Sequence, residues 1–123
     1  MSDMSTMILR NFFTNEKYMR RVVPFMDPAY FEGMNRGLFV EFARYVAQYN
    51  GIPSLESFKI SIADSEVLSE EHLQHAFDIL PDLFIKDEDT ELDWLMDKTE
   101  KFCQDRALFN AVMESISIID GKH

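Results

Sequence analysis

Hydrophobic residues recur every three or four positions along most of the chain, a spacing that predicts an all-α protein. The clearest example runs from Met34 to Asn50, and Gly51 directly after it is a natural C-terminal stop. The apolar positions of this helix are Leu38, Phe42, Tyr45, Val46 and Tyr49.

Two shorter helices are expected before this one. Ser5 is a candidate N-cap for the first and Asn15 for the second, which Pro24 should end because proline cannot donate a backbone hydrogen bond. The segment "MDPAYFEG" is typical of a turn that begins near Asp27 and closes at Gly33.

The segment after Gly51 leaves two interpretations open. Ser54 can cap a helix that carries Phe58 and Ile62 on one face. However, Phe58, Ile60 and Ile62 also alternate as they would in a strand. The helix is favoured, since few residues of the chain occur in β-branched runs.

Two further helices complete the expected set. The first begins at Ser69 and stops near Pro81. An acidic loop follows at residues 87–90, and Thr90 is a candidate cap for a final helix from Glu91 to about Ile119. We therefore divide the chain into a multi-helix globule over residues 1–90 and a long helix over residues 91–120.

The final helix is expected to extend beyond the globule. At 1.5 Å per residue it would be about 43 Å long, whereas a compact domain of this size has a radius of gyration of ~14 Å. An apolar stripe with a seven-residue period follows it through Leu95, Phe102, Phe109 and Ile116. The positions beside the stripe are polar at Lys98 and Asp105 and become apolar at Val112 and Ile119.

The stripe can either close the protein's own core or wait for a partner. Its beginning is assigned to the core and its end to a helix from another segment or subunit. The predicted core residues are Phe31, Phe39, Phe42, Trp94, Leu95, Phe102 and Arg106, the arginine with a packed stem and a guanidinium paired with a carboxylate. The predicted self-association residues are Phe109, Val112, Met113, Ile116 and Ile119.

Composition and charge narrow the class of protein. The chain has 123 residues, enough for one domain, and 46% of them are hydrophobic, eleven being Phe. Its single cysteine suits a reducing cytosol, and no apolar run resembles a signal peptide or a membrane span, so we expect a soluble intracellular protein. Residues 1–60 hold seven Lys and Arg against six acids, whereas residues 61–123 hold five against sixteen. The second part would repel nucleic acid, so any link to DNA is expected to be indirect.

No catalytic, cofactor or metal site is predicted. Cys103 is interpreted as a structural thiol, and His72 with His75 supplies only two ligands of a possible zinc site, with Cys103 as a soft third. The acids of "DEDTELD" alternate as in a calcium loop, but Leu92 and Lys98 stand where that loop needs Gly and Glu.

The order of these segments resembles the N-terminal domain of DnaB-type hexameric replicative helicases. One half of the resemblance is carried by "ILRNFFTNEKYMRRVVPFMDPAYFEGMNRGLFVEFARYVAQYNGIPSLESF". The other half is "WLMDKTEKFCQDRALFNAVMESISII", in which Arg106 matches the family's characteristic arginine. The stretches "PFMDPAYFE" and "TEKFCQDRALFNA" are most similar to the replicative helicase of T-even-type phages.

The resemblance implies a helical globule whose long helix is the first arm of a helical hairpin. In the family this domain forms the collar of a hexamer and docks primase, and in these phages the helicase also meets a loader protein. ATP and Mg²⁺ would belong to an ATPase domain that is absent from this chain. Six such ATPase domains would form a ring in the parent helicase, and single-stranded DNA would be contacted only through that ring. The domain itself would not be an enzyme, and it would work in the cytoplasm of an infected host cell without contacting a membrane. The alternatives are a free-standing acidic helical protein or DNA mimic, and a helical enzyme with zinc at His72, His75 and Cys103.

Overall fold

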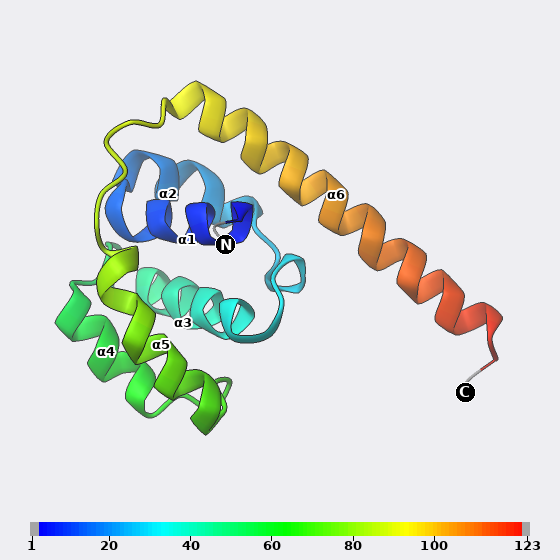
Figure 1. Ribbon diagram of the computed structural model, residues 1–123, viewed down its shortest axis with the longest axis horizontal. Helices are drawn as coiled ribbons and strands as arrows, with labels where there is room; N and C mark the ends of the chain where they lie inside the picture. Colours follow the sequence, from blue (N-terminus) through cyan, green and yellow to red (C-terminus); the bar gives the residue numbers. More distant parts are fainter. Residues whose placement is uncertain (1–2, 122–123) are drawn as a thin grey trace.

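The computed structural model describes residues 3–121, and within that range it contains α-helices, two short 3₁₀ helices and no strand. This agrees with the all-α prediction. Five helices form a globule and the sixth runs along one side of it and then extends away, so that the C-terminal end of α6 lies far from the other helices (Figure 1). The elements are α1 (Met4–Thr14), α2 (Glu16–Val22), η1 (Val23–Phe25), η2 (Pro28–Tyr30), α3 (Gly33–Tyr49), α4 (Leu55–Ala63), α5 (Glu70–Leu83) and α6 (Leu92–Ile119).

Side-chain caps begin most of these helices. The side chains of Asn15, Ser54 and Ser69 accept hydrogen bonds from backbone amides of α2, α4 and α5, as predicted. The first cap differs from the prediction, because Asp3 accepts from the amide of Thr6 and Ser5 lies inside α1. A carboxylate two residues upstream can cap the helix equally well, and the sequence offers both residues.

Two predicted terminal residues of helices also differ, and the end predicted near Pro81 lies two residues further on. Asn50, with φ of 57°, is the left-handed residue that ends α3, in place of Gly51. Pro81 lies inside α5, which continues to Leu83 because Leu83 is buried against the core. Thr90 does not cap α6, since its hydroxyl donates to Asp87 at 2.6 Å and the cap position belongs to Glu91.

The α4 segment is a helix, so the strand interpretation is wrong. Phe58 and Ile62 are completely buried, whereas Ile60 is 74% exposed. Residues 58 and 62 share one face of a helix, but in a strand all three side chains would have pointed the same way. Burial at the four-residue spacing therefore decides between the two patterns.

Aromatic rings fill the centre of the globule. The ring of Phe12 on α1 lies 5.6 Å from that of Tyr18, 5.7 Å from Phe39 and 5.6 Å from Phe42, measured between centroids. Phe31, Phe39 and Phe42, all expected in the core, are at most 2% exposed. Helix α1 contacts α3, α5 and α6, so it connects the globule to the long helix. None of the helices in the described range combines the length and the apolarity that a membrane crossing needs.

Candidate interaction surface

The beginning of α6 is anchored in the globule. Leu95 is 1% exposed and Thr99 is 4% exposed. The Thr99 hydroxyl shares a 2.7 Å hydrogen bond with the Tyr18 hydroxyl of α2, and both oxygens are buried. This bond satisfies two polar groups that would otherwise be stranded in an apolar interior.

Burial raises the pKa of Tyr18 well above its usual value, against the smaller opposite effect of the Thr99 hydrogen bond. The phenol therefore keeps its proton at any physiological pH. The Tyr18–Thr99 pair is a permanent attachment of α6 to the globule, not a pH switch.

The middle of α6 is held by backbone carbonyls of the turn before α3. The Nε of Arg106 donates to the carbonyl oxygen of Tyr30 at 3.1 Å, and its guanidinium pairs with Glu32 at 3.2 Å. One turn later, the side-chain amide of Asn110 donates to the carbonyl oxygen of Ala29 at 2.9 Å. The predicted pairing of Arg106 with a carboxylate is thus present, and the same side chain also fixes the η2 turn.

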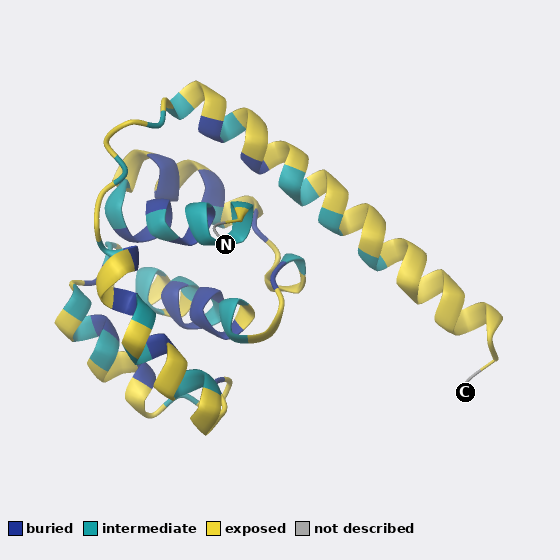
Figure 2. Cartoon of the chain, in the orientation of Figure 1, coloured by how far each residue is buried: buried dark blue, intermediate teal, exposed yellow. Residues whose placement is uncertain are grey.

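Beyond Asn110 the helix leaves the globule. Every described residue of α6 after this point is exposed, which Figure 2 shows as an unbroken yellow end. The predicted self-association residues, which begin just before this point, are all exposed. Their exposed fractions are 48% for Phe109, 47% for Val112, 49% for Met113, 45% for Ile116 and 81% for Ile119.

These five side chains share one side of the helix. At about 100° per residue they span an arc of about 120°, which is the width of a helix face that normally packs on another element. Ile118, also exposed, points to the opposite side. We call the five residues the association arc.

Two of the predicted core residues are not buried as expected. Trp94 is 46% exposed, because it lies about 100° around the helix from the buried Leu95 and sits at the edge of the globule, beside Met7. Phe102 is half-buried, with its ring centroid 5.8 Å from that of Phe31. The predicted core position is therefore wrong for Trp94.

The structure does not favour a reactive or metal-binding role for the cysteine and histidines considered above. Burial raises the pKa of the Cys103 thiol, with a smaller contribution from Glu100, which makes the thiol a poorer nucleophile. Among residues 3–121 no three His, Cys, Asp or Glu side chains gather as metal ligands, so His72, His75 and Cys103 form no such site.

The acidic loop before α6 is a structured turn. The Asp87 carboxylate accepts hydrogen bonds from the Thr90 hydroxyl and from the amides of Asp89 and Thr90. The Thr90 hydroxyl bond, with help from the two amides, lowers the pKa of Asp87. The Asp87 carboxylate therefore stabilises this turn.

Tyr18 and Asn110 were not singled out from the sequence as attachment points. Their roles depend on partners about eighty positions away in the chain, which no local pattern encodes.

The sequence of this chain is similar to that of a known protein. No protein-family model matches the chain. The chain is 30% identical over 116 residues to the DnaB-like replicative helicase of Enterobacteria phage T4. The alignment covers 94% of this chain but spans only 24% of the length of the T4 protein. As the resemblance predicted, this chain is a relative of the DnaB-type replicative helicases of T-even-type phages.

Proposed function

We propose that this chain is the N-terminal collar domain of a phage replicative DNA helicase and acts by self-association and partner docking. The observation that carries the proposal is the change along α6, from a helix anchored by Leu95 and Arg106 to a helix with a bare apolar face. The similarity to about a quarter of the T4 helicase supports the assignment to one domain of a longer protein.

The association arc supplies the means of assembly. Fully burying one large aliphatic or aromatic side chain gains about 1.5–3 kcal/mol, and four of these side chains have roughly half of their surface still to bury, while Ile119 has more. A second helix laid along the arc would recover that free energy. In the parent protein we assign this role to the second arm of a helical hairpin and to a neighbouring subunit.

The remaining activities belong to the parent protein in this proposal. ATP and Mg²⁺ would bind in a separate ATPase domain. Single-stranded DNA would be contacted only by the ring that these ATPase domains form. The collar would hold the ring together and dock primase and the helicase loader at the replication fork, in the cytoplasm of the infected host.

Sedimentation equilibrium of the chain at tens of micromolar tests the proposal. We expect a dimer for the wild-type protein and a folded monomer for Ile116→Asp, because the aspartate puts a charge at the centre of the association arc. The matched control is Ile118→Asp, which makes the same change on the opposite side of the same helix turn and should remain dimeric. A wild-type monomer, or equal loss of association in both variants, would contradict assembly through this face.

A further inference from the structure

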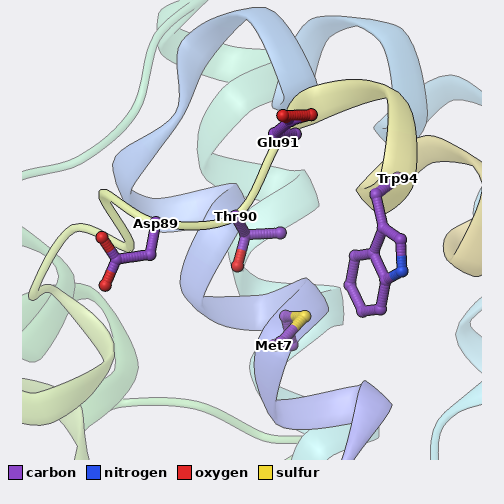
Figure 3. A pocket seen from close by; sticks show the side chains of 5 residues that line it. All are labelled: Met7, Asp89, Thr90, Glu91 and Trp94. Atoms are coloured by element: carbon purple, nitrogen blue, oxygen red, sulfur yellow. The ribbon is translucent and has the colours of Figure 1, made fainter.

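A second exposed apolar surface lies at the other end of α6, on the globule. The Trp94 side chain hangs beside Met7 of α1, and the two form one side of a shallow pocket of about 430 Å³ (Figure 3). Asp89, Thr90 and Glu91 form the other side. Trp94 is 46% exposed, so nothing in the described chain covers this part of the ring.

The rim of the pocket is strongly acidic. Asp89 and Glu91 line it directly and are both exposed. The wider segment from residue 86 to residue 98 carries six acids against two lysines. One of these lysines, Lys86, lies 3.9 Å from Glu88, so part of the positive charge is already paired. The pocket thus presents an aromatic ring within a negative field.

The pocket is preformed. Asp87 fixes the loop through the hydroxyl and amide of Thr90, and the next residue after Trp94 is the buried Leu95. A binding partner would therefore not have to order the loop or the first turn of α6. Preformed surfaces bind more tightly because less conformational entropy is lost on binding.

The ring already attracts a cation from its own chain. The ammonium of Lys98 lies 5.8 Å from the centroid of the Trp94 ring, at the outer limit of a cation–π contact. A guanidinium is a better partner for an indole than an ammonium, because it is planar and more weakly hydrated. Its donors could at the same time reach carboxylates at the rim.

We propose that the Trp94 pocket is a docking site for an arginine-bearing basic segment of a partner protein. One arginine stacks on Trp94 and pairs with Asp89 or Glu91. The negative rim disfavours nucleic acids and anionic lipids, whose phosphates it would repel. The proposal does not depend on the association arc or on the helicase assignment, since it uses a different face of the molecule.

Titration with short peptides tests this proposal, and the chain contains a built-in probe. Trp94 is the single tryptophan, so the indole N–H gives one signal in a nitrogen–proton correlation spectrum and the indole gives the tryptophan fluorescence. The probes are the blocked hexapeptides Ac-GRGRGS-NH₂, Ac-GKGKGS-NH₂ and Ac-GEGEGS-NH₂, at physiological salt. We expect the arginine peptide to shift the indole signal in a saturable way, about twofold more tightly than the lysine peptide. The glutamate peptide should leave the signal unchanged.

Matched charge variants separate a specific pocket from general attraction. The double variant Asp89→Asn, Glu91→Gln removes two charges at the rim and should lower the affinity for the arginine peptide about fivefold. Glu70→Gln with Glu71→Gln removes two charges at the far end of α5, about 20 Å along the helix, and should leave affinity unchanged. An unmoved indole signal at millimolar peptide, or equal weakening by both double variants, would overturn the proposal.

Discussion

The two ends of α6 differ in how they relate to the globule: the first part is anchored to it and the last part is exposed. The first nineteen residues, Leu92 to Asn110, are tied to the globule by a buried leucine, a buried hydroxyl pair, an arginine and an amide. The last nine are all exposed. Yet the same seven-residue apolar stripe runs through both parts. The periodicity of a helix therefore predicts which side is apolar, but not what covers it.

The position of a residue along the stripe should decide how much stability is lost when its side chain is truncated to alanine. Leu95→Ala should lower the free energy of unfolding by about 2–5 kcal/mol, because it leaves a cavity in the core. Ile116→Ala should change it by less than about 0.5 kcal/mol in the monomer, because the side chain is half exposed. Urea unfolding at low protein concentration measures both. Similar losses in the two variants would mean that the outer end is also part of the core.

Removing the buried Tyr18–Thr99 hydroxyl pair should lower the free energy of unfolding by less than the Leu95 truncation does, and the loss should depend on pH. Tyr18→Phe should cost about 1–2 kcal/mol, because the Thr99 hydroxyl loses its partner inside the protein. The raised pKa of Tyr18 means that the unfolded chain loses this proton above pH ~10 while the folded protein keeps it. Stability from this group is thus complete below pH ~10 and falls above it, by about 1.4 kcal/mol per pH unit.

Unfolding of the wild-type protein and Tyr18→Phe at pH 9 and pH 11 measures this slope. The variant should lose less stability between the two pH values than the wild type. An identical loss in both proteins would show that Tyr18 ionises as freely in the folded state as in the unfolded state.

The arginine that holds the middle of α6 should contribute less again. Arg106→Met keeps most of the packed stem and removes the guanidinium, so we expect a loss of about 1 kcal/mol from the bond to the Tyr30 carbonyl. Glu32→Gln removes only an exposed ion-pair partner and should cost less than about 0.5 kcal/mol. Thermal unfolding of both variants checks the order, and a larger loss for Glu32→Gln would reverse the roles assigned here.

Asn110 marks the last attachment, so its loss should be the mildest. Asn110→Ala should cost less than about 1 kcal/mol in global stability, because a single exposed hydrogen bond is removed. Hydrogen exchange of the α6 amides should quicken for residues 107–112 and stay unchanged near Leu95. Quicker exchange along the whole helix would mean that Asn110 also anchors its beginning.

Most of the helices could be predicted from the sequence because their caps and apolar spacing are local. Asn15, Ser54 and Ser69 begin helices as expected. The helix predicted to stop near Pro81 ends two residues later, because one missing donor in the last turn costs less than exposing Leu83 would. The core prediction is wrong for Trp94, because Trp94 lies about 100° around the helix from the buried Leu95 and is 46% exposed.

The long-range attachments could not be predicted from one sequence. Glu41 is 5% exposed and bonded to Ser65, twenty-four positions away, although a mid-helix glutamate usually faces solvent. The Tyr18–Thr99 pair joins two helices that are far apart in the chain. Such contacts depend on how elements pack together, which the pattern of a single element does not contain.

The central claim is that the outer end of α6 is a surface for assembly, and concentration-dependent hydrogen exchange tests it most directly. Amides of residues 111–119 should exchange quickly in dilute protein and become protected as the concentration rises through the dimerisation range. In Ile116→Asp that protection should not appear, while in Ile118→Asp it should appear as in the wild type. Exchange at these amides that does not depend on concentration would contradict the claim and leave the association arc as simple solvent-exposed helix.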